Sequence, residues 1–428
     1  MQYYSTNKKA KKVSFKEAVV KGLADDKGLY FPEEIPQLPQ SFFDEIEQYK
    51  VHEIAYRFLK PYAGDDLSDN ELIDLLQDAL NFDIPLVKVK DNIYSLELFH
   101  GPTLAFKDVG ARVMARFLSK FAAQDNKVTI LVATSGDTGS AVANGFLGVP
   151  GIDVVVLYPK GMVSEIQEKQ FTTLGKNITA LEVNGTFDDC QRMVKEAFAD
   201  KELNEKMQLS SANSINVARF LPQAVYYFYA YAQLADKTKP VAISVPSGNY
   251  GNLTAGLIAK KSGLPVHHFI ASANINDVVP EYLEKGIFTP RPSVATISNA
   301  MDVGNPSNFA RILELYGHDW HKIKAEISGY SFSDDETRKT IRKVYDEQGY
   351  ILDPHGAVAY LGLNEYLKND EVQGIFLETA HPAKFFDTVQ KEISGTLEIP
   401  QRLKASLEKE KKSIEIGNSL EDLKGFLL

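Results

Sequence analysis

The sequence has almost no cysteine, since Cys190 is the only one among 428 residues. A single thiol excludes disulfide bonds within the chain and zinc sites built from cysteines, and it fits a reducing compartment. Residues 186–198 have the pattern of a capped amphipathic helix in which Cys190 shares one face with Val194 and Phe198. We therefore expect Cys190 to be a core residue.

Long apolar runs and basic blocks are also missing. No 18 consecutive residues are apolar, and the lysines near the N-terminus are not followed by an apolar segment, so the sequence predicts neither a membrane span nor a secretory signal. The formal charge of -10 argues against nucleic-acid binding by long-range attraction. We expect a soluble, cytoplasmic protein that captures any anionic substrate with local hydrogen-bond donors.

Several common catalytic motifs are absent as well. There is no GxxxxGK[ST] loop, which disfavours an NTPase, and the Gly-rich turns match neither the GxGxxG of dinucleotide-binding folds nor the GxSxG of hydrolases. The histidines form no HExxH motif, the nearest approach being His52 and Glu53. A zinc hydrolase therefore lacks support.

The length of the chain and its hydrophobic pattern predict two open α/β domains. A chain of 428 residues is too long for one ordinary core. From about residue 127, β-branched runs alternate with helical patterns, which is typical of βαβ units and a mostly parallel sheet. We expect an N-terminal extension over residues 1–90, a smaller α/β domain over 127–214, and a large domain formed by 91–126 and 215–428.

The individual elements follow from the same periodicity. We expect strands over residues 128–134, 153–159, 177–185, 241–246, 267–273 and 374–380. Helices are expected over residues 164–175, 216–235 and 253–261, and from 187 and 381 onward. The aromatic cluster within 226–231 is interpreted as core, and the charged stretch 403–417 as a solvated helix.

Lys107 is the first candidate for catalysis. It follows a turn and an aromatic residue in LFHGPTLAFKDVGAR, residues 98–112, and opens a predicted helix. A pocket lined by Phe106 and other apolar groups would lower the pKa of this amine, which makes it useful as a nucleophile or base.

Three polar segments between strands and helices are candidates for binding. The turn SGNYGN, residues 247–252, has the placement of an anion site at a helix N-terminus, although such turns are often only turns. The loop TSGDTG offers Ser135, Asp137 and Thr138, which could equally be a plain N-cap. In NSINVAR, residues 213–219, Asn213, Ser214 and Arg219 suggest an anion site, or an N-cap with a solvent-facing arginine.

Taken together, GPTLAFKD, TSGDTG, PSGNYGN and LETAHPAKF resemble the motifs of the threonine synthase family, which are pyridoxal phosphate enzymes of fold type II. The resemblance runs almost end to end and includes YYST and SFKEAVVKGLADDKGLYFPE in the N-terminal extension. The chain departs from the family at residues 5–8, STNK in place of STRG, and at 26–29, DKGL in place of DGGL. The resemblance implies two α/β domains like those of the tryptophan synthase β subunit.

The resemblance also implies roles for particular residues. Lys107 would hold pyridoxal phosphate as a Schiff base, Asp137 would lie beside its 3′-oxygen, and Thr379 would face its pyridine nitrogen. Glu378, the neighbour of Thr379 on a strand, should point to the opposite face. The cofactor phosphate would be held by Gly248, Asn249, Tyr250, Gly251 and Asn252. The substrate would contact Ser135, Thr138, Asn213, Ser214 and Arg219.

The implied reaction converts O-phospho-L-homoserine and water to L-threonine and phosphate, with Lys107 as the base at Cα and Cβ. The protein would be a monomer or homodimer. The main alternative is a serine or threonine dehydratase, which would share Lys107 and the phosphate turn but lack the extension. A catalytically silent homologue is disfavoured, because it would be expected to have lost the lysine or the phosphate turn. A two-domain α/β protein without a cofactor is disfavoured as well, because all four motifs would then be coincidental.

Overall fold

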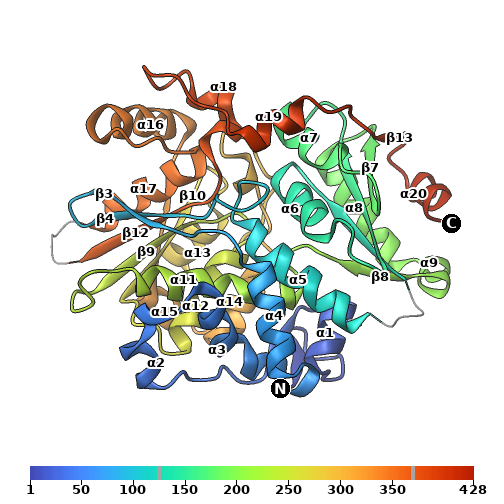
Figure 1. Cartoon of the computed structure of the whole chain (residues 1–428), viewed down its shortest axis with the longest axis horizontal. Coiled ribbons are helices and arrows are strands. Elements are labelled where there is room, and N and C mark those ends of the chain that lie inside the picture. The colour runs from blue at the N-terminus through green and yellow to red at the C-terminus, as the bar shows by residue number, and fades with distance from the viewer. Residues whose placement is uncertain (123–126, 368–371) are drawn as a thin grey trace.

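The computed structural model describes residues 1–122, 127–367 and 372–428, and it contains two parallel sheets side by side (Figure 1). The central strands Val128–Ala133, Val241–Pro246 and Gln373–Glu378 are apolar and buried along their whole length, as expected for sheets covered on both faces. The larger sheet has the order β11-β10-β9-β12-β4-β3, with only β3 antiparallel to its neighbour. Its strands are β3 (Leu86–Lys90), β4 (Ile93–Glu97), β9 (Val241–Pro246), β10 (His268–Ala273), β11 (Ile327–Ser331) and β12 (Gln373–Glu378).

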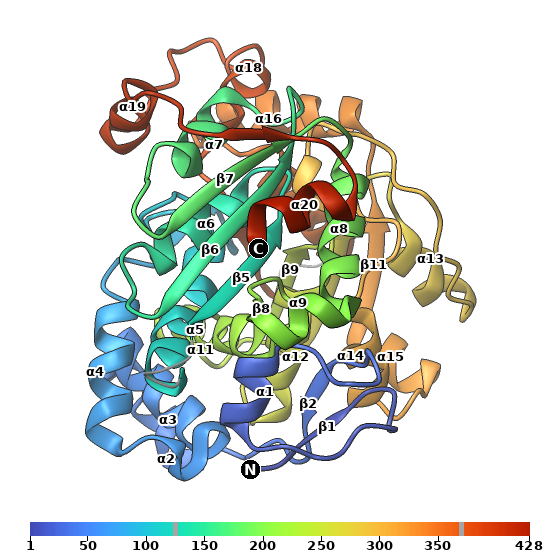
Figure 2. The same cartoon turned by 90° about the vertical axis from the view of Figure 1, so that its right-hand side faces the viewer.

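The smaller sheet has the order β13-β7-β6-β5-β8 and is parallel throughout. It consists of β5 (Val128–Ala133), β6 (Ile152–Pro159), β7 (Ile178–Val183), β8 (Gln208–Ser211) and β13 (Ile414–Ile416). The helices that follow its strands are α6 (Asp137–Phe146), α7 (Glu165–Thr172), α8 (Phe187–Ala199) and α9 (Lys201–Lys206). Figure 2 shows α20 (Leu420–Leu427) beside α8, with β13 along the edge of β7.

Helices cover both faces of the larger sheet. α17 (Pro354–Tyr366), which begins at the N-cap Asp353, packs on β9, β10 and β12, and α16 (Asp334–Gln348) packs on α17. The other helices of this part of the chain are α10 (Val217–Phe220), α11 (Ala224–Ala232), α12 (Gly251–Lys261), α13 (Val278–Lys285), α14 (Phe309–Leu315), α15 (Trp320–Glu326), α18 (Phe386–Val389) and α19 (Gln401–Leu407). Short 3-10 turns are η3 (Leu221–Gln223), η4 (Asn299–Met301) and η5 (Pro382–Phe385).

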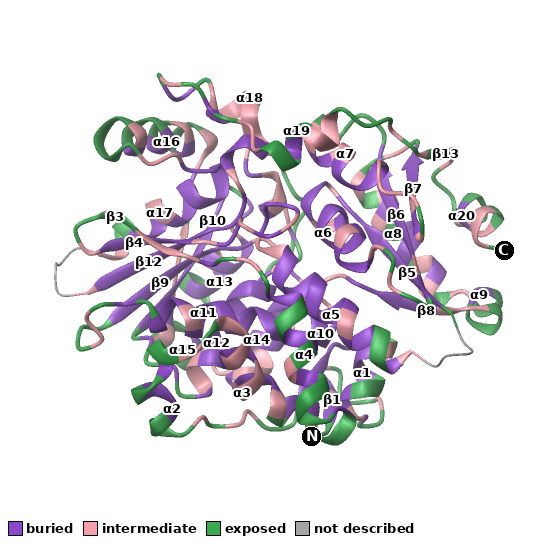
Figure 3. Ribbon diagram, in the orientation of Figure 1, coloured by how far each residue is buried: buried purple, intermediate pink, exposed green. Residues whose placement is uncertain are grey.

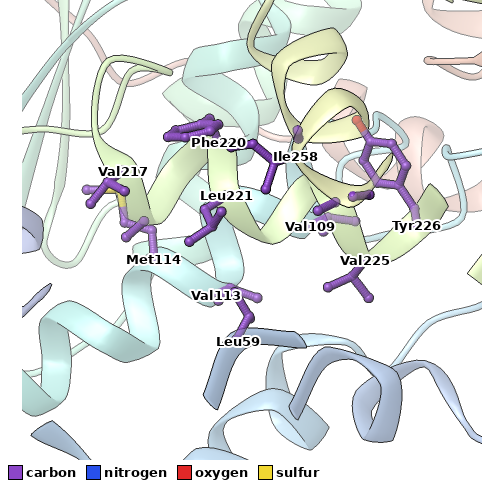
Figure 4. Packing of buried hydrophobic residues seen from close by; sticks show 14 of the residues in the cluster. Leu59, Val109, Val113, Met114, Val217, Phe220, Leu221, Val225, Tyr226 and Ile258 are labelled. Atoms are coloured by element: carbon purple, nitrogen blue, oxygen red, sulfur yellow. The ribbon is translucent and has the colours of Figure 1, made fainter. Parts of the chain in front are cut away.

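The N-terminal segment packs beneath both sheets and shares their core. It contains a hairpin-like pair, β1 (Tyr3–Ser5) and β2 (Tyr30–Pro32), and the helices α1 (Phe15–Lys21), α2 (Gln40–Asp44), α3 (Val51–Ala63) and α4 (Asp69–Ala79), with 3-10 turns η1 (Ile46–Gln48) and η2 (Gly64–Asp66). α5 (Lys107–Phe121) lies between this segment and the sheets. In Figure 4, Leu59 of α3 lies against Val113 of α5, and Val225 of α11 lies nearby. The position of α5, which begins with Lys107, is therefore fixed from several sides.

The core predictions from the sequence are confirmed. Cys190 is fully buried, and burial raises the pKa of its thiol to about 12, so the thiol is inert. Thr186 and Asp189 form the predicted capping box. Tyr226 and Tyr227 are buried between α11 and its neighbours, and the burial pattern of Figure 3 concentrates in the sheets and the helices around α5. No helix in the described ranges combines the length and apolar character that a membrane crossing requires.

Two predicted elements are wrong in part. The helix expected over 216–235 is interrupted by η3, because Pro222 has no N–H to continue the α-helical pattern. The charged stretch 403–417 is helical only as far as Leu407 and ends in β13, where Ile414 and Ile416 alternate with Glu415. Glu415 is paired with Lys160 at the sheet edge, 2.7 Å away.

These elements also change where two segments belong. β13 and α20 join the smaller sheet, so residues 414–427 pack there and not with the large domain to which we assigned them. β3 lies in the larger sheet, whereas residues 86–90 were expected in the N-terminal extension. Residues 86–90 pair with β4 through a tight antiparallel connection. This pairing with a neighbouring strand places them in the larger sheet and not in the N-terminal extension.

Candidate active site

Lys107 is the first residue of α5, and main-chain contacts from β12 fix its position. The Phe106 amide donates to the Thr379 carbonyl at 2.8 Å, and Ala105 forms an isolated bridge with Ala380. Asp108 accepts hydrogen bonds from the amide and the hydroxyl of Thr103, which closes the preceding turn. The motifs GPTLAFKD and LETAHPAKF are therefore held together at the carboxyl end of β12.

The environment of Lys107 makes its amine a weaker base than an ordinary lysine. Close packing lowers the pKa of Lys107 to about 8; Asp137 opposes this shift, while the cations Arg219 and Lys384 add to it. The Nζ atom lies 5.5 Å from the centre of the Phe106 ring. A substantial share of this amine is neutral near pH 8, as a nucleophile or general base requires.

The turn 247–252 joins β9 to α12 and has the form of an anion cradle. Tyr250 has a left-handed backbone, with φ of 60°, which turns the chain into the N-terminus of α12. Gly248 lies against the 3-10 turn η4, and a Cβ atom there would be 2.6 Å from the Ala300 carbonyl oxygen. The main-chain N–H groups at the positive end of an 11-residue helix suit a phosphate.

The side chains of this turn are engaged in shaping it. Asn249 donates from Nδ2 to Ser214 Oγ at 2.8 Å, and its Oδ1 accepts from the amide and hydroxyl of Ser307. Asn252 donates to the Pro246 carbonyl at 2.8 Å and accepts from the Leu253 amide. These two amides hold the turn open, and the main chain is left to contact an anion.

Arg311 lies behind the same turn and was not predicted. Its guanidinium is fully buried and donates to the carbonyl of Tyr30 in β2 and to the carbonyls of Ser214 and Ile215. Burial lowers the pKa of Arg311 to about 9. Arg311 thus ties the N-terminal segment to Ser214, and Ser214 in turn accepts from Asn249 in the cradle. An arginine within a helical pattern gave no signal of this in the sequence.

The loop 134–139 follows β5 and presents Asp137 to the site. Thr134 Oγ1 accepts from the amides of Gly136 and Gly139, which shapes the start of α6. Asp137 is buried and accepts from Gln167 Nε2 at 2.9 Å and from Lys384 Nζ at 2.6 Å. Burial alone would raise the pKa of Asp137, but Lys384 and Lys107 hold it well below its usual range, so the carboxylate is ionised.

Lys384 is the second functional group that the sequence did not single out. It is almost fully buried in η5, and besides Asp137 it contacts the carbonyl oxygen of Thr103 at 2.9 Å. Lys384 belongs to the motif LETAHPAKF, and its ammonium contacts residues of two others, TSGDTG and GPTLAFKD. The residue stands in LETAHPAKF, so the motif itself was the available signal.

Arg219 lies behind Lys107 with its guanidinium bound to the main chain. It donates from Nη1 to the Lys107 carbonyl at 2.5 Å and from Nε to the Ala212 carbonyl at 3.1 Å, and burial lowers its pKa to about 10. The solvent-facing arginine considered from the sequence is excluded, since its exposed fraction is 3%. Asn213 and Ser214 lie in the loop before α10, and the Oδ1 of Asn213 has no partner among the described residues.

Glu378, the last residue of β12, and Thr379, which follows it, have different surroundings. Glu378 contacts the N-terminus of α17, where its Oε1 accepts from the Asp353 amide at 2.5 Å. Burial and the nearby Asp353 raise the pKa of Glu378 well above its usual value. Thr379 is buried on the strand end beside Phe106. Ser135 and Thr138 are partly exposed at the start of α6.

Two parallel sheets that meet at a lysine, a helix N-terminus and a buried carboxylate define a pyridoxal phosphate enzyme of fold type II. The family described as "Pyridoxal-phosphate dependent enzyme" matches residues 81–375. "Threonine synthase N terminus" matches 2–80, and "Threonine synthase, C-terminal" matches 356–427.

Individual relatives agree over the whole chain. Threonine synthase of Haemophilus influenzae is 47% identical over 429 residues, covering 100% of both chains. The crystal structure of the Escherichia coli threonine synthase has a TM-score of 0.93 and 43% identity, and covers 100% of this chain and 99% of the other. The pyridoxal-phosphate-bound threonine synthase from Brucella melitensis has a TM-score of 0.94 and 35% identity, covering 100% and 98%. This chain belongs to the threonine synthase family, and the predicted fold class and cofactor are confirmed.

Proposed function

We propose that the chain converts O-phospho-L-homoserine and water to L-threonine and phosphate, with pyridoxal phosphate as cofactor. The observation that carries this proposal is the position of Lys107, an amine with a pKa of about 8, beside Asp137 and next to the Phe106 amide that donates to the Thr379 carbonyl. Matches to the N-terminal and C-terminal parts of threonine synthases favour this reaction over that of a dehydratase.

The site has the groups that the cofactor requires. The main chain of residues 248–252 would take its phosphate, Lys107 its aldehyde, and the Thr379 hydroxyl its ring nitrogen. When bound, the cofactor withdraws electrons from the amino acid substrate. A hydroxyl cannot hold a protonated ring nitrogen as a carboxylate can, and the one carboxylate next to Thr379 faces α17 instead. This arrangement would restrain electron withdrawal and leave more of the proton chemistry to Lys107.

Lys107 would act as the base that moves protons at the substrate. Its neutral amine would take the Cα proton and then a Cβ proton as phosphate leaves from Cγ. A proton would then be delivered to Cγ, the hydroxyl of water would add at Cβ while its proton goes to the released phosphate, and Cα would regain its proton. Arg219 supports this role from behind, since its hydrogen bond to the Lys107 carbonyl fixes the start of α5. Its positive charge also favours the neutral amine.

The substrate phosphate would be held by Asn213, Ser214 and Arg219, with Ser135 and Thr138 on the opposite side. Arg219 has five N–H donors and uses one at Nε and one at Nη1 for main-chain carbonyls, so further donors remain for an anion. We further propose a cytoplasmic location and a monomer or homodimer.

The proposal is tested by incubating the pyridoxal-phosphate-loaded protein with O-phospho-L-homoserine and measuring phosphate and amino acid products. Equal amounts of phosphate and threonine are expected. A protein that is inert with this substrate but releases ammonia and a 2-oxo acid from serine or threonine would be a dehydratase. Lys107→Ala, loaded under the same conditions, is the control for phosphate released without catalysis by the site.

A further inference from the structure

We propose that Lys384 donates a charged hydrogen bond to the 3′-oxygen of the cofactor, with Asp137 and the Thr103 carbonyl holding its ammonium in place. This inference rests on the assignment of pyridoxal phosphate and does not depend on the substrate. It assigns a binding role to a lysine of η5, and it changes the role of Asp137 from a direct contact to a positioning residue.

The first argument is the chemistry of Asp137. The resemblance places Asp137 beside the 3′-oxygen, where an amide side chain could donate a hydrogen bond. The carboxylate of Asp137 is ionised and can only accept hydrogen bonds. Its Oδ1 already accepts from Gln167 and Lys384. Two anions side by side would repel each other in a buried site. The site therefore needs a cationic donor near Asp137.

The second argument is the geometry of Lys384. Its Nζ lies 2.6 Å from Asp137 Oδ1, in direct contact with the carboxylate that the resemblance places beside the 3′-oxygen. An ammonium has three N–H donors, and the described residues accept two of them, at Asp137 and at the Thr103 carbonyl. Because the side chain is 1% exposed, water does not compete freely for the third.

The third argument is the balance of charge around the pair. Lys107 and Arg219 add positive charge from α5 and α10, and Asp108 and His381 also face Lys384. Burial lowers the pKa of His381 to about 4, so that this imidazole is neutral near pH 7. Asp108 is committed to Thr103. The ammonium of Lys384 thus has one carboxylate partner in contact, and an anionic oxygen would complete its coordination.

The experiment is a binding cycle with two ligands, pyridoxal 5′-phosphate and its 3-deoxy analogue, which lacks the oxygen in question. Dissociation constants are measured on the cofactor-free full chain, for the wild type and for Lys384→Met. We expect the substitution to weaken pyridoxal phosphate by roughly 10- to 100-fold, the value of a charge-assisted hydrogen bond, and the deoxy analogue by less than about 3-fold. Equal weakening of both ligands would overturn the proposal.

A second variant protects the test against misfolding, since Lys384→Met leaves Asp137 buried without its partner. The double variant Asp137→Leu, Lys384→Met removes both charged groups together. We expect the same selective loss of affinity for pyridoxal phosphate. Circular dichroism checks that the double variant is folded. Retention of the wild-type preference for the 3-oxygen in this double variant would contradict the proposal. If the wild-type protein prefers pyridoxal phosphate to the deoxy analogue as expected but forms no threonine, only the proposed reaction is contradicted.

The visible absorption band of the bound cofactor, recorded without substrate, gives an independent readout. Loss of a cation near the 3′-oxygen favours the protonated cofactor, so the band of Lys384→Met should change at a higher pH than that of the wild type. Lys384→Arg restores a cationic donor and should return the midpoint toward the wild-type value. An unchanged midpoint in a folded Lys384→Met protein would overturn the role of the ammonium.

Discussion

Arg219 donates a hydrogen bond from Nη1 to the main-chain oxygen of Lys107, so the arginine predicted to bind substrate also supports the lysine proposed as the catalyst. The two residues belong to α10 and α5, which cross closely at Gly110, where the Arg219 carbonyl leaves no room for a side chain. An arginine in this position would couple the proposed substrate-phosphate site to the start of α5. Its replacement should therefore alter both catalysis and stability.

For Arg219→Ala we expect kcat/KM to fall by an amount equivalent to about 2–5 kcal/mol, because a buried charged partner of the substrate phosphate is lost. The melting temperature should fall as well, since the Lys107 and Ala212 carbonyls lose their donor. Arg219→Lys, which retains the charge but not the forked geometry, should retain part of the activity. An unchanged kcat/KM in Arg219→Ala would move the substrate phosphate to another part of the site.

Lys107→Ala should reduce turnover by at least roughly 10⁴-fold, because it removes both the covalent anchor and the proton carrier. The absorption band of the lysine-linked cofactor should be lost and replaced by that of the unlinked aldehyde, because the phosphate cradle is intact. Lys107→Arg retains a cation without a usable base and is the matched control. Turnover of Lys107→Ala at the normal rate would end the catalytic assignment.

The pH dependence of cofactor capture follows from the lowered pKa of Lys107. Below about pH 8 the amine is mostly protonated and cannot attack the aldehyde, so the rate of capture by the cofactor-free protein should rise with pH and level off above about 8. Stopped-flow absorbance measures this rate. A midpoint near 10.5, the value for an exposed lysine, would contradict the structure of this pocket.

The sequence predicted the parts of the site that depend on local pattern. Lys107 opens a helix after a turn, and Asp137 and the turn 247–252 lie where a strand ends and a helix begins. Each became a candidate from that placement. Lys384 and Arg311 were missed because their roles come from contacts across long stretches of chain, with Thr103 and Tyr30, respectively. Periodicity carries no information about such contacts.

The same limit explains the errors in the fold. The predicted strands correspond to β5, β6, β7, β9, β10 and β12, and the predicted helices at 164–175, 187 and 253–261 to α7, α8 and α12, since each depends on a window of a few residues. The strands β4, β8 and β11 and the long helices α16 and α17 were not predicted. β13 is three residues long and is a strand only because β7 offers an edge to pair with. Its register, Ile414 with Leu181 and Ile416 with Val183, is set by a partner more than 200 residues away in the chain.

Gly248→Ala should weaken pyridoxal phosphate binding without unfolding the protein. The added Cβ would meet the Ala300 carbonyl oxygen at 2.6 Å and the Met301 Cα at 2.8 Å, so η4 or the cradle must shift. We expect the dissociation constant to rise by roughly 10-fold or more, as for loss of about one main-chain hydrogen bond to a charged phosphate. Gly425→Ala in α20, where a Cβ meets nothing within 4 Å, is the control and should bind normally.

Arg311→Met tests whether the N-terminal segment supports the cradle. The substitution leaves the carbonyls of Tyr30, Ser214 and Ile215 buried without their donor, so we expect a loss of roughly 3–5 kcal/mol in the free energy of unfolding. Because Ser214 also accepts from Asn249, the cradle should loosen and the affinity for pyridoxal phosphate should fall with it. Denaturant unfolding and ligand titration measure the two effects. Arg311→Lys retains the charge but has fewer hydrogen-bond donors. It should therefore retain only part of the stability and only part of the cofactor affinity. Normal cofactor affinity in a destabilised but folded Arg311→Met protein would show that Arg311 anchors the N-terminal segment alone.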